Sequence, residues 1–284
     1  MAPSPVLTPS GVSALLARHG LRPDRRLGQH FLADLNIARR IAGLAGVGAG
    51  DRVFEIGAGI GSLTVALAET GAEVVALELD RRLGAALAET VAGCAAPDRV
   101  HVALGDALDV DLGALLGDHE WHCVSNLPYN VAAPVVVRLL EEAPMVHALL
   151  VMVQREVAER LVAPAGSRTR GRVSVLVEYH ARAALAGAIG RTVFVPRPRV
   201  DSALVRLERW PEPPVSVPST ERLFALVKAG FGQRRKQLRG ALRPLLGSTA
   251  DEVLRAAAVD PSARAEALDL DQWAAIARAC PEAA

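Results

Sequence analysis

The stretch that decides the fold is Val53-Phe54-Glu55-Ile56-Gly57-Ala58-Gly59-Ile60-Gly61. It begins as a buried strand, passes through three closely spaced glycines and continues with helical spacing over residues 63–70. Glycines in such a turn permit positive φ angles and let a ligand approach the backbone. The spacing is G-x-G-x-G after an acid, rather than the G-x-G-x-x-G of dinucleotide-binding folds. The stretch predicts a strand, a ligand-binding turn and a helix.

Strand-like runs alternate with helical stretches on either side of this turn. Strands are predicted at residues 53–56, 74–77, 100–104, 123–125 and 149–153, and helices at 34–46, 63–70, 81–92 and 131–142. Asp34 and Gly46 are the expected caps of the first helix. Such alternation builds a parallel sheet with helices on both faces. A strand at 205–207 is expected to close the sheet, whereas residues 174–190 are compatible with helix or strand.

Three parts are expected along the chain. Residues 1–210 are predicted to form the cofactor-binding catalytic domain, in which 1–24 are a loose extension with a short helix at 12–19. Residues 211–218 contain four prolines and predict a linker, because proline continues neither a helix nor a strand ladder. Residues 219–284 have helical spacing throughout. The predicted fold class is therefore α/β with a small C-terminal helical domain.

The cofactor prediction depends on acids that follow successive strands. Glu78 ends the second strand, 21 residues after Gly57, and can accept hydrogen bonds from both ribose hydroxyls of a nucleoside. Asp106 follows the third strand and suits the amino group of an adenine. With Gly57, Gly59 and Gly61 at the same sheet edge, these acids favour S-adenosyl-L-methionine, whose product is S-adenosyl-L-homocysteine. Glu55 is either part of this site or a structural acid.

Asn126-Leu127-Pro128-Tyr129 follows the fourth strand and carries the predicted catalysis. The amine of adenine is a poor nucleophile, because its lone pair is delocalised into the ring. The Asn126 carboxamide oxygen and a backbone carbonyl can accept its two N–H bonds and stabilise positive charge during methyl transfer. Pro128 stiffens the turn and Tyr129 can stack on an extruded base. The motif predicts methylation of an adenine amine, and the alternative is an ordinary turn that caps the next helix.

The motif in this position resembles the ribosomal RNA adenine dimethyltransferase family. Further blocks are similar in order: Leu27-Gly28-Gln29-His30-Phe31-Leu32, residues 171–179, residues 193–204 and residues 231–239, the last as in the small-subunit branch. Together they cover about residues 25–245. The resemblance implies a Rossmann-like class I methyltransferase sheet with a small helical domain.

The resemblance also assigns residues to the site. It implies that the cofactor is contacted by His30, Leu32, Gly57, Glu78, Asp106 and Asn126, and that Tyr129 and Phe194 sandwich the target adenine. Phe194 has an alternative interpretation as a core aromatic residue. The family often has asparagine in place of His30, and a histidine would make cofactor contact sensitive to pH.

The activity implied by the resemblance is dimethylation of two adjacent adenosines near the 3′ end of 16S rRNA. The substrate is expected to be the small ribosomal subunit or its precursor, with the reaction coupled to subunit maturation. One alternative is the large-subunit rRNA methyltransferase that gives macrolide resistance. Another is an assembly factor that acts mainly by binding. A nicotinamide oxidoreductase is disfavoured by the glycine spacing.

Charge is distributed unevenly along the chain. The net charge is +1, yet residues 51–120 carry 4 basic and 13 acidic side chains, whereas residues 121–250 carry 19 and 9. Residues 222–243 hold seven basic side chains and no acid, which suits phosphate binding on a helix. The predicted RNA-binding residues are Arg234, Arg235, Lys236 and Arg239 in this run, and Arg170 and Arg172 in a second cluster. Such runs can also be solvated faces.

Other classes are disfavoured by composition. The three cysteines are far apart and the seven histidines form no ligand cluster, so neither a disulfide framework nor a metal site is expected. The longest apolar run, at about 143–153, is too short to span a bilayer. A cytoplasmic monomer is expected, without a membrane partner.

Overall fold

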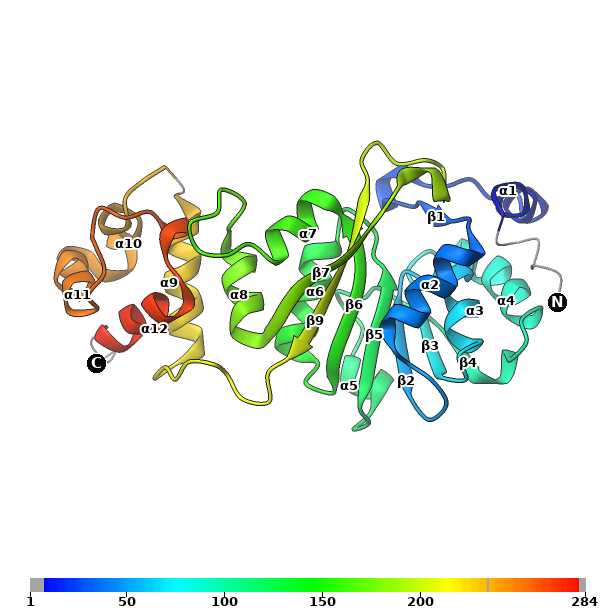
Figure 1. Ribbon diagram of the computed structural model, residues 1–284, viewed down its shortest axis with the longest axis horizontal. Helices are drawn as coiled ribbons and strands as arrows, with labels where there is room; N and C mark the ends of the chain where they lie inside the picture. The colour runs from blue at the N-terminus through cyan, green and yellow to red at the C-terminus, as the bar shows by residue number, and fades with distance from the viewer. Residues whose placement is uncertain (1–7, 234, 281–284) are drawn as a thin grey trace. The chain divides into compact units, whose positions relative to one another are not determined.

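The computed structural model describes residues 8–233 and 235–280 of the chain (Figure 1). Packing divides the chain into two compact units. Unit 1 comprises Met1–Ala158 and Ala184–Glu208, and unit 2 comprises Glu159–Ala183 and Arg209–Ala284. Residues 159–183 therefore pack with the C-terminal part, whereas the sequence placed them in the domain 1–210. The segment 211–218 forms neither helix nor strand.

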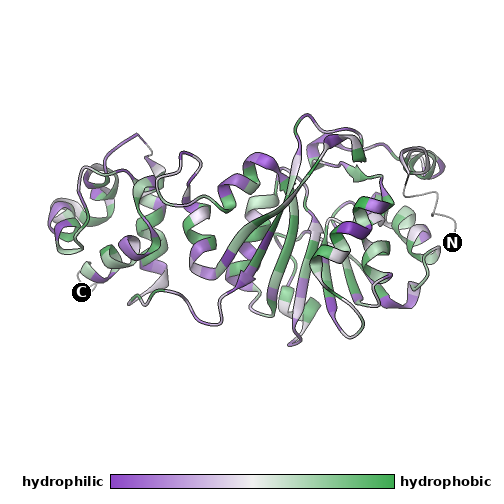
Figure 2. Ribbon diagram, viewed as in Figure 1, coloured by the Kyte–Doolittle hydropathy of each residue, from purple (hydrophilic) through white to green (hydrophobic). Residues whose placement is uncertain are grey.

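The main sheet of unit 1 has seven strands in the order β4-β3-β2-β5-β6-β9-β7. The first five are parallel to one another: β4 (Val100–Leu104), β3 (Glu73–Glu78), β2 (Arg52–Ile56), β5 (Trp121–Asn126) and β6 (Val146–Gln154). Their residues are predominantly hydrophobic (Figure 2), as expected for strands covered on both faces. The predicted α/β architecture is confirmed, and each predicted strand lies within an observed one.

The far side of the sheet differs from the prediction in two respects. β9 (Ser202–Arg209) runs antiparallel to β6, so the sheet is mixed rather than wholly parallel. β9 also does not close the sheet, because β7 (Ala181–Ile189) lies outside it at the edge. Five alanines make up most of β7, and a run of small apolar residues does not distinguish strand from helix. The ambiguous stretch 174–190 is thus the end of α8 (Arg172–His180) followed by β7.

The helices predicted at 12–19, 34–46, 63–70, 81–92 and 131–142 are all present, and two short helices at 112–116 and 155–161 were not predicted. They are α1 (Pro9–Arg18), α2 (Leu35–Ala45), α3 (Ser62–Ala68), α4 (Gly84–Ala92), α5 (Leu112–Leu116), α6 (Ala132–Glu142) and α7 (Arg155–Leu161). Both predicted caps of α2 are confirmed: Asp34 accepts from the backbone N–H groups of Asn36 and Ile37, and Gly46 has a φ of 72°. The main core joins α2 and α3 to the sheet through side chains such as Ile41, Leu67 and Val74.

A small second sheet in unit 1 holds the N-terminal segment in place. β1 (Phe31–Leu32) pairs antiparallel with β8 (Phe194–Val195), with Leu32 opposite Phe194. The pairing is extended by a hydrogen bond of 2.7 Å from the Ala33 N–H group to the Val193 carbonyl. Segments more than 160 residues apart in the sequence are thereby joined.

Unit 2 contains α8 and the C-terminal helices. These are α9 (Thr220–Gly232), α10 (Leu238–Leu246), α11 (Ala250–Ala256) and α12 (Leu270–Ala279). Their core surrounds Trp273, which is fully buried. The basic run 222–243 is not one continuous helix, because α9 ends at Gly232 and α10 begins at Leu238. Gln233, which follows Gly232, leaves the helical conformation with φ −129° and ψ 58°.

No helix within residues 8–233 and 235–280 combines the length and apolar character needed to cross a membrane. Across the same residues, no group of three or more His, Cys, Asp or Glu side chains is arranged to hold a metal ion.

Candidate functional site: a nucleoside pocket beside an Asn-Leu-Pro-Tyr turn

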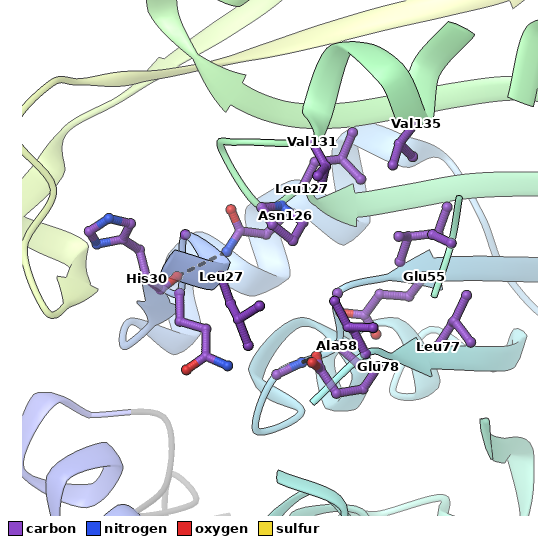
Figure 3. Close-up of a pocket in the computed structure, with 18 of the residues that line it drawn as sticks. Leu27, His30, Glu55, Ala58, Leu77, Glu78, Asn126, Leu127, Val131 and Val135 are labelled. Carbon is purple, nitrogen blue, oxygen red and sulfur yellow. Dashed lines mark hydrogen bonds between the residues drawn. The ribbon is translucent and has the colours of Figure 1, made fainter. Parts of the chain in front are cut away.

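The order of the strands reverses beside β2, and a pocket opens at this point. β3 and β4 lie on one side of β2, whereas β5 and β6 lie on the other. Open α/β sheets bind ligands at such a switch point, outside the carboxyl ends of the strands. The pocket is lined by residues 27–32, 55–60, 62–63, 77–79, 105–107, 126–131 and 135. Figure 3 shows the two buried acids Glu55 and Glu78 facing it together with Asn126.

The glycine turn between β2 and α3 adopts the predicted conformation. Gly57, Gly59 and Gly61 have φ angles of 75°, 61° and 88°, a region that disfavours side chains. Gly57 and Gly59 line the pocket. Gly61 does not, and a Cβ there would lie 2.9 Å from a methyl carbon of Leu87 in α4. Gly61 therefore serves helix packing rather than the pocket wall.

Glu55 is the most deeply buried acid of the pocket. Its side chain is 1% exposed, and burial raises its pKa to about 8. Within the described residues, its Oε2 atom and the Oγ atom of the neighbouring Ser62 have no hydrogen-bond partner. Buried polar atoms normally find partners, so these two atoms mark a place where a polar ligand fits.

Glu78 and Asp106 lie at the same sheet edge in different surroundings. Glu78 is buried, which raises its pKa, and its two oxygens accept from the backbone N–H groups of Gly59 at 2.7 Å and Asp80 at 2.8 Å. A carboxylate has further acceptor capacity for hydroxyl groups. Asp106 is exposed, and its Oδ1 accepts from the Leu108 N–H group at 2.8 Å.

The Asn126–Tyr129 turn joins the pocket directly. Asn126 ends β5, and its Nδ2 atom donates to the backbone carbonyl of His30 at 3.2 Å (Figure 3). Leu127 is buried and donates its N–H to the Met152 carbonyl, which anchors the turn on β6. The Tyr129 hydroxyl lies 2.6 Å from the Ser202 Oγ atom, and burial raises its pKa. Carboxamide and ring are therefore held in fixed orientations.

His30 lines the pocket, with its ring and backbone in different roles. The Nδ1 atom lies 2.7 Å from the carbonyl oxygen of Pro196, and since a carbonyl only accepts, this nitrogen carries the proton. The ring centroid lies 5.1 Å from that of Tyr129. In Figure 3 the imidazole projects away from Glu55 and Glu78. On the side of the pocket that holds these acids, His30 therefore presents its backbone and not its ring. Leu32 contributes a buried side chain to the pocket wall.

Phe194 is placed differently from the prediction. Its side chain is 3% exposed and belongs to the main core with Leu32 and Ile189. It is not part of the pocket wall. Burial of a large aromatic ring removes much apolar surface from water, which accounts for its place in the core. In this structure the interpretation of Phe194 as a core residue holds, and the ring that faces Tyr129 is His30.

The predicted RNA-binding residues lie in unit 2 and differ in exposure. Arg235, Lys236 and Arg239 are exposed around the start of α10, and Arg172 is exposed at the start of α8. Arg234 lies outside the described residues. Arg170 is 1% exposed and forms an ion pair of 2.6 Å with Glu178, with further hydrogen bonds to the Leu268 and Ala163 carbonyls. Its prediction as a phosphate contact is wrong, because the guanidinium is enclosed by protein.

Two residues that support the pocket, Gln29 and Asp80, were not predicted from the sequence. Gln29 Nε2 donates to Asp80 Oδ2 at 2.9 Å, which ties the N-terminal segment to the turn after β3. The hydrogen bond from Arg82 lowers the pKa of Asp80 to about 2. Gln29 belongs to the similar block 27–32 and Asp80 follows Glu78 by two residues, so both were near recognised signals, but their pairing required the fold.

Comparison with known proteins agrees with this geometry. Residues 21–281 match the family described as ribosomal RNA adenine dimethylase. The chain is 47% identical to ribosomal RNA small subunit methyltransferase A of Thermobifida fusca, over 97% of this chain and 96% of the relative. It is 45% identical to the protein of that name from Cutibacterium acnes, over 100% and 97%.

Solved structures show the same fold. A dimethyladenosine transferase from Plasmodium falciparum has a TM-score of 0.73 at 22% identity, covering 87% of this chain and 96% of that one. The 23S rRNA methyltransferase ErmE has a TM-score of 0.66 at 25% identity, covering 88% and 98%. Sequence match, fold and pocket agree, and the chain belongs to the ribosomal RNA adenine dimethylase family.

Proposed function

We propose that this protein transfers methyl groups from S-adenosyl-L-methionine to the N6 amines of two adjacent adenosines near the 3′ end of 16S rRNA. The observation that carries the proposal is the shared pocket of Glu55, Glu78 and Asp106 with the Asn126–Tyr129 turn. The small-subunit assignment is supported by the names of relatives at 45% and 47% identity over nearly the full chain. Methylation of the small ribosomal subunit or its precursor couples the reaction to maturation of that subunit.

The residues present fit the cofactor. S-adenosyl-L-methionine supplies an electrophilic methyl group on a sulfonium, and it also carries an ammonium, a ribose and an adenine. The unpartnered Glu55 Oε2 is suited to the ammonium, because a buried acid gains most from an opposite charge. Glu78 suits the ribose hydroxyls, and Asp106 suits the 6-amino group of the adenine. Gly57, Gly59 and Leu32 form walls that the ligand can approach closely.

Asn126 is oriented for the target amine. Because its Nδ2 atom donates to the His30 carbonyl, its Oδ1 atom is fixed as the acceptor on the other side of the carboxamide. An acceptor aimed at an adenine N–H directs the nitrogen lone pair and stabilises the positive charge that builds up there. Alignment of the two reactants provides the remaining acceleration, and the nitrogen loses its proton after transfer.

Tyr129 is suited to hold the extruded base. Its hydroxyl is hydrogen-bonded to Ser202, which fixes the ring plane on the pocket wall. Stacking on such a ring is worth about 1–3 kcal/mol per base. With Phe194 in the core, the second face of the base is left to other groups, and the His30 ring is the neighbour in this structure.

Unit 2 is proposed to bind the rRNA. The exposed side chains of Arg235, Lys236, Arg239 and Arg172 are suited to phosphate oxygens. A ribosomal substrate places the reaction in the cytoplasm, and we propose that the protein acts there as a monomer.

The proposal is tested by methyl transfer from labelled S-adenosyl-L-methionine to immature small ribosomal subunits, large-subunit rRNA and duplex DNA. Mass spectrometry of the digested nucleosides should find dimethyladenosine from the small subunit alone. Label on large-subunit rRNA would favour the second candidate, which the likeness to ErmE supports. An Asn126→Ala variant that lacks transfer but keeps full biological activity would instead favour an assembly factor.

A further inference from the structure

Arg138 is a nearly buried cation on the helix that follows the Asn126–Tyr129 turn. Val131 and Val135 line the pocket at the start of α6 (Figure 3), and Arg138 lies seven residues after Val131 on the same helical face. Its side chain is 15% exposed. The guanidinium donates from Nη1 to the Ala107 carbonyl at 2.7 Å and from Nη2 to the Val110 carbonyl at 2.8 Å. Its Nε atom donates to Glu142 at 2.8 Å.

The two carbonyls belong to the short turn that begins with Asp106. Within the turn, the N–H groups of Asp109 and Val110 donate to the Asp106 carbonyl at 3.0 and 2.8 Å. The Leu108 N–H group donates to the Asp106 carboxylate. The turn lies between β4 and α5, and its Asp106 and Leu108 side chains are exposed. A planar, charged guanidinium that donates to both the Ala107 and Val110 carbonyls therefore fixes where this turn sits relative to α6.

We propose that Arg138 is a positioning residue, which holds the 106–110 turn so that the Asp106 carboxylate selects the 6-amino group of the cofactor adenine. The inference rests on the proposed function, because it takes Asp106 to face that amino group. The start of α6 thereby lines the pocket with Val135, and Arg138, one helical turn later, fixes the position of Asp106. The same helix that follows the catalytic turn thus also sets cofactor specificity.

The geometry requires arginine rather than any cation. Two carbonyls three residues apart are reached at once by the two terminal nitrogens, while Glu142 holds the third and fixes the guanidinium plane. A lysine ammonium at the same position is a point donor on a flexible stem and grips one carbonyl at a time. Glu142 is largely exposed. Glu142→Gln removes its charge but keeps a side-chain oxygen that can accept from the Arg138 Nε atom, so this variant is the matched control.

The test compares binding of S-adenosyl-L-homocysteine with its inosine analogue, in which a 6-oxo group replaces the 6-amino group. Titration calorimetry on the full chain should show the wild type preferring the amino ligand by about tenfold or more, since the hydrogen bond is made to a charged acceptor. Arg138→Met should reduce that preference to less than about threefold, and Arg138→Lys should give an intermediate value. Glu142→Gln should keep the wild-type preference.

The possible outcomes distinguish a failure of the role of Arg138 from a failure of the proposed role of Asp106. Wild type that binds neither ligand, or binds both equally, overturns the proposed role of Asp106 and the inference with it. A preference that survives in Arg138→Met overturns the inference alone. Equal weakening of both ligands with a lower unfolding temperature shows a merely structural role and also overturns it. Arg138→Lys carries the comparison where Arg138→Met does not fold. In an Asp106→Asn background, Arg138→Met should change the ratio no further.

Discussion

Gly57 and Pro128 approach each other so closely that a Cβ atom on the glycine would lie 3.0 Å from the proline Cδ atom. Gly57 belongs to the turn after β2, and Pro128 belongs to the Asn126–Tyr129 turn after β5. The two strands are neighbours in the sheet. The contact therefore packs the turn that lines the proposed cofactor site directly against the turn that carries the proposed catalytic residues.

Gly57→Ala is expected to damage the site while leaving the fold largely intact. The residue has a φ of 75°, and a methyl group there would force the Pro128 ring to shift, so strain of about 1–3 kcal/mol is expected. Cofactor affinity should fall by about tenfold or more, as measured by titration calorimetry. Gly43→Ala in α2 is the control, because a Cβ there meets nothing within 4 Å. That variant should gain about 0.5–1 kcal/mol of stability. Unchanged cofactor affinity in Gly57→Ala would contradict the close approach.

Cofactor affinity is expected to depend on pH through Glu55. Burial raises its pKa from 4.5 to about 8, so between these values the folded protein holds a proton that the unfolded chain has released. This group therefore lowers stability as pH rises through that window. A bound ammonium favours the carboxylate, so binding should release a proton and tighten with rising pH, by at most about tenfold per unit. Calorimetry at pH 6.5 in buffers of different ionisation enthalpy measures the release.

Glu55→Gln is the control for this pH dependence. The amide has a similar shape and does not titrate, so proton release on binding and the loss of stability toward pH 8 should both disappear. Equal proton release by the variant and the wild type would show that another group titrates.

Tyr129→Phe and Tyr129→Ala should separate the hydroxyl from the ring. The phenylalanine loses the hydrogen bond to Ser202 but keeps the stacking face, so its single-turnover rate should stay within a few-fold of the wild type. The alanine should lose about 1–3 kcal/mol of base stacking with cofactor affinity unchanged. Ser202→Ala should behave as Tyr129→Phe does. Equal losses in the phenylalanine and alanine variants would contradict a stacking role.

Arg170→Met and Lys236→Met should affect different properties of unit 2. Arg170 is enclosed with three hydrogen-bond acceptors, so its loss should lower stability by about 2–3 kcal/mol. The salt dependence of RNA binding should not change. Lys236 is exposed, so its variant should keep the unfolding temperature and lower the slope of log affinity against log salt by about one. Thermal unfolding measures the stability, and binding titrations at several salt concentrations measure the slope. A changed slope for Arg170→Met would indicate that Arg170 contacts the RNA after all.

Much of the fold could be predicted because local signals agree along unit 1. Periodicity predicted the strands between residues 53 and 154 and the helices at 34–46, 63–70, 81–92 and 131–142, but not the short helix α5. The caps Asp34 and Gly46 were visible as residue types. The edge strand β7 could not be predicted, because its alanines fit either structure. The interruption between α9 and α10 was missed because the basic residues on either side of Gly232 fit one helical pattern.

The sequence by itself determined which chemical groups stand at the ends of the strands. Glu55, the glycine turn, Glu78, Asp106 and Asn126 follow from spacing, since parallel strands present their carboxyl ends at one edge. Only the tertiary structure decided which side chains face the pocket and which are enclosed. Phe194 and Arg170 look like surface contacts in the sequence, yet both are buried. Arg138 looks like a helix surface residue, yet it grips a distant turn. Burial and long-range hydrogen bonds depend on segments far apart in the chain, and one-dimensional spacing does not specify which of them meet.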